Sequence, residues 1–313
     1  MNERALLAFT HPACLQHATG PDHPERPQRL EAVLQALQVS HPRLEWRQAP
    51  RATREQLLRA HTPALLDQAL ATVAEGLIAL DPDTMASPGS AEAALRAAGA
   101  GIGAVDAVID GSIRRAFCAV RPPGHHATLD AVMGFCLLNN IAIAARHAID
   151  VHGLSRVAIV DFDVHPGNGT QAIFEHDPRV LYASSHQSPL YPGTGAENET
   201  GCGNVHNVAL HANADGTAFR AAWRTRLLPA LDAFTPQLLL ISAGFDAHRR
   251  DPLAQLQLDA DDFSWITREL VAIADRHAAG RIVSMLEGGY DLQALAECSV
   301  AHVDALLQPA ERH

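Results

Sequence analysis

The sequence has few cysteines and no paired pattern among them. Five of its 313 residues are cysteine, and no two have the Cys-x-x-Cys spacing of redox or zinc-ribbon motifs. Disulfide frameworks belong to oxidising compartments, so this scatter predicts reduced thiols and a cytoplasmic location. The five are Cys14, Cys118, Cys136, Cys202 and Cys298.

Long apolar runs and an excess of positive charge are also missing. No stretch of about 18 consecutive apolar residues occurs, and the first residues do not lead into the apolar segment of a signal peptide. The 24 Lys and Arg residues are outnumbered by 35 Asp and Glu, which gives a formal net charge of −11. Such a chain has no general attraction to nucleic acids or anionic membranes. We therefore expect neither partner, while a homo-oligomer is left open.

The remaining composition is that of a folded globular chain. Hydrophobic residues make up 47% and charged residues 19%, which is enough apolar surface for a core and too little charge for disorder. No internal repeat, low-complexity tract or linker interrupts the sequence. We therefore expect a single domain over residues 1–313.

Apolar runs of strand length alternate with longer segments of helical period. Strands are predicted over residues 5–9, 116–120, 157–160, 180–183, 205–210, 238–242 and 282–286. Helices are predicted over residues 27–38, 90–110, 137–152, 217–234, 261–279 and 292–307. Continuous apolar strands separated by helices are typical of a sheet buried on both faces. The sequence therefore predicts an α/β fold with a central, mainly parallel sheet.

Five of the predicted strands are followed directly by groups that bind metals or transfer protons. The segments are 121–126 (RPPGHH), 161–165 (DFDVH), 184–186 (SSH), 243–248 (AGFDAH) and 287–290 (EGGY). In open α/β sheets, ligands bind outside the carboxyl ends of the strands. We therefore expect these five segments to meet at one edge of the sheet and to form one site.

Asp163, His165 and Asp246 are the predicted metal ligands. Asp163 and His165 stand two residues apart where a strand ends, so their side chains face the same way. Asp246 comes from another strand end. Two carboxylates and one imidazole, without a thiolate, suit Zn²⁺ with an open position, although Fe²⁺ or another divalent ion is compatible. Asp161 is expected to support these ligands or to bind another cation, because catalytic zinc usually takes three protein ligands.

His125, His126 and Tyr290 are predicted to transfer protons. One histidine of the pair can act as a general base on water, and the other can hold a proton or orient the scissile group. Tyr290 follows two glycines, and its phenol can donate to a developing oxyanion. Other histidines are expected to be ordinary surface or core groups, such as His17, His147, His152, His176 and His277.

Together these motifs resemble the zinc-dependent histone deacetylase and acetylpolyamine amidohydrolase superfamily, most closely its class II and bacterial branch. The resemblance spans residues 23–290. It includes the segments 23–30 (HPERPQRL), 121–126, 134–140 (GFCLLNN), 161–170 (DFDVHPGNGT), 191–195 (YPGTG), 242–251 (SAGFDAHRRD) and 287–290. It implies an arginase- and deacetylase-like three-layer fold around a central, mainly parallel sheet.

The resemblance also implies a role for each catalytic residue. The three predicted ligands would hold zinc, and His126 would be the likelier general base. Asp161 would lie behind His125, and Tyr290 would be the catalytic tyrosine.

A structural potassium ion is a further implication of the resemblance. Asp161 and Ser184 would bind it, together with backbone groups that include that of Ser185. The resemblance also suggests a second potassium site near Phe174, Asp177 and Val180.

The substrate would lie in an aromatic channel. By resemblance, Phe135 and Tyr191 would form its walls, and the carbonyl of Gly134 would accept a hydrogen bond from the substrate amide. Polyamine-specific members of the human-like branch carry a glutamate where this chain has Leu253. The apolar residue indicates acetyl-lysine in a protein or peptide.

The sequence therefore predicts a zinc-dependent deacetylase that acts on N6-acetyl-lysine. Three alternatives remain: an acetylpolyamine amidohydrolase with the same chemistry, a binuclear manganese ureohydrolase and a non-catalytic acyl-binding protein. The ureohydrolase would need additional bridging carboxylates. Intact predicted ligands, base and tyrosine argue against a binding protein.

Overall fold

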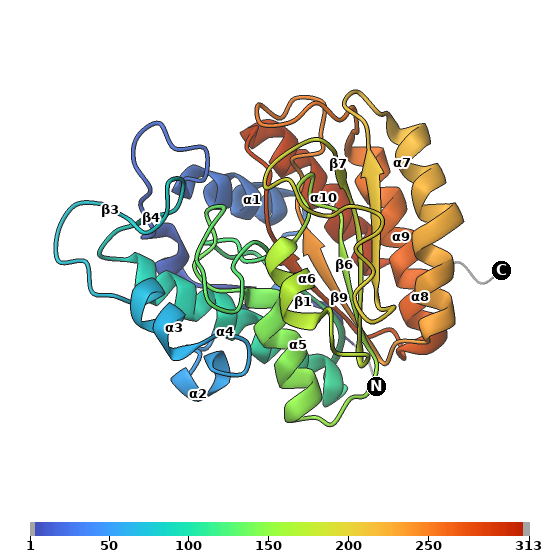
Figure 1. Ribbon diagram of the computed structural model, residues 1–313, viewed down its shortest axis with the longest axis horizontal. Coiled ribbons are helices and arrows are strands. Elements are labelled where there is room, and N and C mark those ends of the chain that lie inside the picture. Colours follow the sequence, from blue (N-terminus) through green and yellow to red (C-terminus); the bar gives the residue numbers. More distant parts are fainter. Residues whose placement is uncertain (1–3, 309–313) are drawn as a thin grey trace.

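The structure, a computed structural model, describes residues 4–308 and is built around an eight-stranded sheet (Figure 1). The strand order is β2-β1-β5-β10-β9-β6-β7-β8, and every neighbouring pair is parallel. The strands are β1 (Arg4–Thr10), β2 (Glu45–Gln48), β5 (Ile113–Cys118), β6 (Val157–Asp161), β7 (Val180–Gln187), β8 (Val205–Leu210), β9 (Leu238–Ala243) and β10 (Ile282–Leu286). The predicted parallel α/β fold is confirmed.

Helices cover both faces of the sheet and give three layers. Helices α4 and α5 pack together on one face, and α1, α9 and α10 pack together on the other (Figure 1). The long helices are α1 (Pro27–Ser40), α4 (Ser90–Ile109), α5 (Asn140–Asp150), α9 (Ala260–His277) and α10 (Leu292–Leu307). Because both faces are covered, the central strands β6, β9 and β10 are buried at every position.

The five strands that precede the predicted site segments are neighbours in the sheet. They are β5, β10, β9, β6 and β7, in that spatial order. Their ends are in register, since Asp161 at the end of β6 pairs with Ser184 of β7 and with Ser242 of β9. The carboxyl ends of these strands therefore lie at one edge of the sheet, as predicted. The segment 184–186 was predicted to follow its strand, but it lies within β7, which continues to Gln187, and Asp161 and Ala243 are the last residues of β6 and β9.

Several element boundaries differ from the prediction. The strand predicted over 116–120 begins at Ile113 and ends at Cys118. The helix predicted over 137–152 begins at Asn140, because the Asn139 side chain caps it by accepting from the backbone N–H of Ala142.

The helix predicted over 217–234 contains a change of winding. It consists of α7 (Gly216–Ala222), a π-helical turn (Trp223–Leu227) and α8 (Leu228–Phe234). Pro229 follows the π turn in the sequence and lacks a backbone N–H, which disfavours a regular α-helical register at this point.

Several short elements were not predicted. Besides β2, they are the two-stranded antiparallel hairpin β3 (Ile78–Ala79) and β4 (Met85–Ala86), the 3₁₀ turn Pro12–Leu15, and helices α2 (Arg54–Leu57), α3 (Pro63–Ala69) and α6 (Asn168–Phe174). Among the described residues, no helix is long and apolar enough to cross a membrane.

Candidate metal centre and active site

Asp163, His165 and Asp246 converge at the carboxyl edge of the sheet, as predicted. Nδ1 of His165 lies 3.1 Å from Oδ1 of Asp163 and 3.2 Å from Oδ2 of Asp246. One ligand atom from each residue lies within 4.8 Å of the others, and all three residues are buried. Three potential ligand side chains from the ends of two strands are therefore close enough to bind one metal ion.

The donor set fits a divalent cation. Oδ2 of Asp246 is buried and accepts no well-aligned hydrogen bond, although Nδ1 of His165 lies 3.2 Å from it; such a carboxylate oxygen is costly to bury unless a cation compensates it. The other carboxylate oxygens are fixed by the backbone: Oδ1 of Asp246 accepts from Val164 N–H and Oδ2 of Asp163 accepts from Gly288 N–H, both at 2.8 Å. A Cβ at position 288 would collide with Asp246, so glycine is required there. Two carboxylates and one imidazole are donors that suit a divalent cation such as Zn²⁺.

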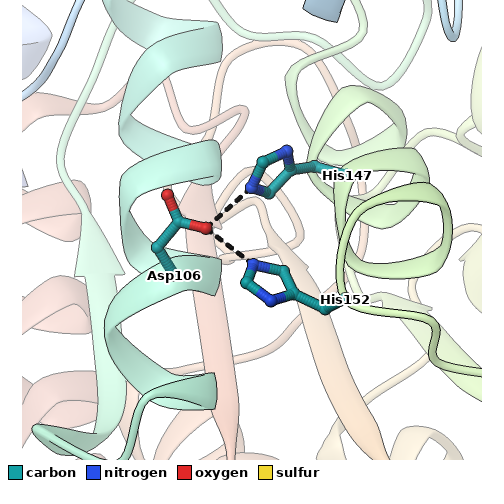
Figure 2. Close-up of side chains that lie close together, drawn as sticks. All are labelled: Asp106, His147 and His152. Atoms are coloured by element: carbon teal, nitrogen blue, oxygen red, sulfur yellow. Dashed lines mark hydrogen bonds and ion pairs between the residues drawn. The ribbon is translucent and has the colours of Figure 1, made fainter.

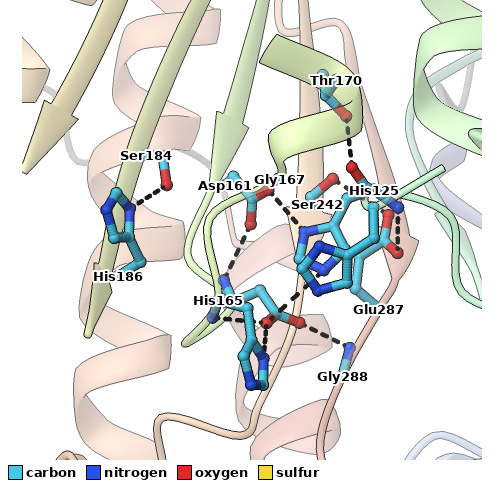
Figure 3. Close-up of polar contacts among 12 residues, drawn as sticks. His125, Asp161, His165, Gly167, Thr170, Ser184, His186, Ser242, Glu287 and Gly288 are labelled. Atoms are coloured by element: carbon cyan, nitrogen blue, oxygen red, sulfur yellow. Dashed lines mark hydrogen bonds and ion pairs between the residues drawn. The ribbon is translucent and has the colours of Figure 1, made fainter. Parts of the chain in front are cut away.

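The paired histidines lie beside these ligands and have different partners. The rings of His125 and His126 are 4.1 Å apart, and the ring of His126 is 5.7 Å from that of His165. Nδ1 of His125 lies 2.9 Å from Oδ2 of Asp161, whereas Nδ1 of His126 lies 2.6 Å from the amide oxygen of Asn168. Figure 3 shows His125, Asp161 and His165 gathered at the ends of the strands.

These partners give the two histidines opposite electrostatics. Burial opposes the charge on His125, but the carboxylates of Asp161 and Asp163 raise its pKa well above the usual value. Burial, followed by the positive charges of His125 and His165, lowers the pKa of His126 well below the usual value. His126 is therefore the histidine that stays neutral and can accept a proton.

Tyr290 lies over the buried side chain of Arg29. The guanidinium carbon of Arg29 is 4.7 Å from the centre of the Tyr290 ring, and its nitrogens donate to the backbone oxygens of Gly289 and Glu287 at 2.6 and 2.5 Å. The backbone N–H of Tyr290 donates to Asp251 at 2.7 Å. Burial raises the pKa of Tyr290 well above its usual value, although Arg29 acts against this shift. The phenol therefore keeps its proton and remains a donor.

The predicted substrate residues lie around these catalytic groups. The ring of Phe135 is 5.8 Å from that of Tyr290, and the ring of Tyr191 is 5.2 Å from that of His126. Gly134, at φ 57°, packs so closely on His126 that a Cβ would overlap the imidazole. Its carbonyl accepts a weak contact from the thiol of Cys136, at 3.3 Å from Sγ.

Leu253 is joined to Tyr290 through one carboxylate. The backbone N–H of Leu253 donates to Oδ1 of Asp251 at 3.0 Å, and Oδ2 of the same carboxylate accepts from Tyr290. Leu253 is only partly buried. The Asp251 carboxylate therefore links the backbone at Leu253 to the backbone at Tyr290.

The residues predicted to bind potassium lie on the neighbouring strands β6 and β7. Oδ1 of Asp161 accepts from the backbone N–H of Asp163 at 3.1 Å, and Ser184 pairs with Asp161 across β6 and β7. The hydroxyl of Ser184 contacts His186 at 3.0 Å (Figure 3). The hydroxyl of Ser185 accepts from the Trp223 indole at 2.9 Å, which leaves its carbonyl rather than its side chain as a candidate ligand.

The second suggested potassium site contains a side-chain amide. Nδ2 of Asn204 donates to the carbonyl oxygens of Phe174, Asp177 and Val180 at 2.8, 3.1 and 2.8 Å. Oδ1 of Asn204 accepts from the backbone N–H of Cys202, which fixes the orientation of the amide. A neutral NH₂ group therefore already faces the three carbonyls that the sequence suggested for a cation.

Two functional contacts were missed in the sequence. Asn168, the partner of His126, stands in the first turn of the unpredicted helix α6. Glu287 accepts from the backbone N–H groups of Gly124 and His125 at 2.7 and 3.2 Å, and burial raises its pKa to about 7. This carboxyl joins the loop of the paired histidines to the loop of Tyr290. The asparagine within 161–170 was the available signal for the first contact.

Comparisons with known proteins agree with this geometry. A family model, the histone deacetylase domain, matches residues 23–306. The histone deacetylase-like amidohydrolase of Pseudomonas aeruginosa is 41% identical, with 97% of this chain and 86% of the relative covered. A probable deacetylase of Archaeoglobus fulgidus is 38% identical, with 90% and 80% covered. The crystal structure of the HDA15 HD domain superimposes with a TM-score of 0.93 at 35% identity, covering 98% of this chain and 89% of that one.

Proposed function

The chain belongs to the histone deacetylase family, and on that basis we propose that it is a zinc-dependent deacetylase acting on N6-acetyl-lysine in proteins or peptides. The observation that carries the proposal is the buried Asp163–His165–Asp246 cluster, in which Oδ2 of Asp246 accepts no well-aligned hydrogen bond and the ring of His126 lies 5.7 Å from that of His165. The products would be acetate and a free lysine amine.

Zinc would be held by Asp163, His165 and Asp246. When bound, it would polarise the acetyl carbonyl and lower the pKa of a water molecule to about 7. The backbone N–H groups of Val164 and Gly288 hold the two carboxylates in place before any ion binds. Such support of the ligands preserves their orientation.

His126 would take a proton from the attacking water. Its Nδ1 faces the amide oxygen of Asn168, so this nitrogen carries the hydrogen and Nε2 has the free lone pair. As the water oxygen bonds to the acetyl carbon, charge develops on the carbonyl oxygen. Tyr290 would donate a hydrogen bond to that oxygen.

Collapse of the tetrahedral intermediate would break the carbon–nitrogen bond. The leaving amine takes a proton from a histidine of the pair, and acetate keeps the oxygen of the water. His125 is suited to hold positive charge in this step because Asp161 lies 2.9 Å from its Nδ1. We propose that a potassium ion bound by Asp161, Ser184 and backbone groups including that of Ser185 supports this part of the site.

A peptide substrate is favoured by the residues around the catalytic groups. Phe135 and Tyr191 offer aromatic surfaces for the lysine methylenes, and the Gly134 carbonyl is available to accept from the substrate amide. Apolar Leu253 presents no charge to the second ammonium of a polyamine. An acetylpolyamine amidohydrolase is the second candidate, because the chemistry at the metal would be the same.

We propose that residues 1–313 act as one catalytic domain in the cytoplasm. The eight strands form a single sheet, and the site is assembled from five of them. A cytoplasmic location is proposed because the five cysteines are scattered in the sequence without a disulfide pattern.

Kinetics on two substrate classes test the proposal. The zinc-loaded enzyme is assayed on a panel of acetyl-lysine peptides beside acetylated putrescine and spermidine, with His126→Ala as the inactive control. We expect a higher kcat/KM on at least one peptide than on either polyamine. Preference for a polyamine over every peptide would promote the second candidate, and turnover of neither class would contradict the proposed deacetylase activity.

A further inference from the structure

Asp106, His147 and His152 form a second cluster at the other edge of the sheet. Asp106 lies in the last turn of α4 and His147 in the last turn of α5, while His152 follows the end of α5. Helix α4 ends just before β5 begins, and α5 just before β6 begins. The cluster therefore lies at the amino ends of the strands, opposite the catalytic cluster. Figure 2 shows both imidazoles directed at one carboxylate.

The three groups approach one another closely. Nε2 of His147 and Nε2 of His152 each lie 2.7 Å from Oδ1 of Asp106, and the two rings are 5.2 Å apart. Two imidazole nitrogens and a carboxylate oxygen are donors for Zn²⁺ and Ni²⁺. Ligand bonds of about 2.0–2.1 Å would require these atoms to separate to about 3.3 Å, a small movement for side chains at the surface.

Access and local charge favour a cation at this position. The side chains of Asp106 and His152 are 51% and 25% exposed, so an ion can enter and keep water ligands, whereas His147 is 7% exposed and fixes the inner side. The C-terminal ends of α4 and α5 meet here, and each carries the partial negative charge of unpaired carbonyl groups.

We propose that Asp106, His147 and His152 bind a divalent transition-metal ion such as Zn²⁺, which clamps the end of α4 to the end of α5. This ion is separate from the catalytic one and takes no part in the deacetylation. Because it binds only the folded chain, it raises the thermal stability of the enzyme, and the increase grows with the logarithm of the ion concentration once that concentration exceeds the Kd.

Arg59 opposes this ion through the tautomer of His147. Nη1 of Arg59 lies 3.2 Å from Nδ1 of His147, and arginine only donates, so neutral His147 carries its hydrogen on Nε2. Metal binding through Nε2 requires that hydrogen on Nδ1, where it would meet the guanidinium. Arg59 must therefore move away. Arg59 also forms an ion pair with Glu55, whose side chain is 85% exposed, and such an exposed pair holds the guanidinium only weakly.

Zinc titrations of the zinc-loaded enzyme, followed by isothermal calorimetry, test the inference. Wild type should bind one further Zn²⁺ per chain. His152→Ala removes a ligand, and Asp106→Asn keeps a hydrogen-bond acceptor but loses the charge; each should weaken the second binding at least about tenfold. Arg59→Gln should tighten it by a few-fold. His277→Ala, which removes a histidine from the surface cluster of Asp232 with Arg276, is the matched control and should bind like wild type.

Thermal unfolding and deacetylase assays complete the test. Added Zn²⁺ should raise the Tm of wild type and His277→Ala but not of His152→Ala, while turnover of all these variants stays at the wild-type value. No second Zn²⁺ in the wild type, or an equal second affinity in His152→Ala, would overturn the inference. If the zinc-loaded wild type showed no deacetylase turnover at all, the proposed function would be contradicted instead, so the two failures are distinguishable.

Discussion

Nδ1 of His126 lies 2.6 Å from the amide oxygen of Asn168, whereas the neighbouring His125 faces the carboxylate of Asp161 at 2.9 Å. The amide nitrogen of Asn168 points to the Met133 sulfur at 3.4 Å, which fixes the orientation of the amide. A neutral amide oxygen orients the imidazole and favours its positive charge less than a carboxylate does, so burial still lowers the pKa of His126. This difference supports the proposed roles, in which His126 is the neutral base and His125 holds a proton.

Replacing Asn168 by Asp should remove this difference. A carboxylate beside His126 raises the pKa of the imidazole, so the base is protonated over more of the working range. The acid limb of the kcat profile should move upward by about one to three pH units. Zinc content should not change, and Asn213→Asp, which adds the same charge at an exposed position, should keep the wild-type profile. An unshifted profile in Asn168→Asp would show that His126 is not the base.

The phenol of Tyr290 should contribute strongly to kcat. Tyr290→Phe removes one donor to the developing oxyanion and should lower kcat by about 10²–10³. Tyr191→Phe is the matched control, because it also deletes one hydroxyl but keeps the aromatic wall, and it should retain most of the activity. Steady-state kinetics with zinc analysis measure both. A kcat of Tyr290→Phe close to that of wild type would show that the phenol does not stabilise the oxyanion and that Tyr290 acts only in packing.

Substrate choice should respond to the charge at position 253. Leu253→Glu places a carboxylate where it can face the second ammonium of an acetylated polyamine. A partly exposed charge pair contributes about 0.2–1 kcal/mol, so polyamine turnover relative to peptide should rise by a few-fold. Leu253→Gln is the uncharged control. The same ratio in the Glu and Gln variants would show that charge at this position does not select the substrate.

The sequence contained most of the site but not the contacts that tune it. The metal ligands and the histidine pair follow directly from apolar strands, so the rule that binding groups lie at carboxyl strand ends was sufficient to bring them together. Asn168, in the first turn of α6, contacts the imidazole of His126, and Glu287, which directly follows β10, accepts from the backbone N–H of His125. Both contacts join segments that are far apart in the sequence. Nothing in the local pattern of the sequence specifies such contacts.

The same limit applies to the fold. Buried strands have a strong apolar signal, but β2 lies at the sheet edge, and none of its four residues is fully buried. The cluster of Asp106, His147 and His152 joins α4 to the end of α5. Along the chain, His147 is 41 residues and His152 is 46 residues from Asp106. His147 and His152 were therefore interpreted as ordinary polar groups, since only the packing of the two helices reveals their shared carboxylate.

The free energy of unfolding should decrease as the pH is lowered below about 6.5, because buried histidines are neutral in the folded protein. Burial lowers the pKa of His302 to about 3, and its neighbours Thr267 and Ser284 are uncharged. The unfolded chain binds this proton near the ordinary value of 6.5, so the stability from His302 is fully present above that pH. It is lost as the pH falls toward about 3, by up to about 1.4 kcal/mol per pH unit.

Urea unfolding between pH 7 and pH 4 measures this dependence. His302→Gln should be less stable than wild type at pH 7 but should lose less stability on acidification. His176→Gln, at an exposed position, should keep the wild-type slope. A His302→Gln slope equal to that of wild type would show that this histidine does not take up a proton on unfolding.

Reconstitution of metal-stripped enzyme with zinc tests the central claim most directly. Turnover of an acetyl-lysine peptide is followed while zinc is added, beside Asp246→Ala with a circular dichroism spectrum that verifies folding. We predict that activity is absent without metal, rises linearly and saturates at one zinc per chain, while folded Asp246→Ala stays inactive and does not fill this tight site. Full turnover without metal, saturation only at two tightly bound ions, or wild-type activity in Asp246→Ala would contradict a single zinc held by Asp163, His165 and Asp246.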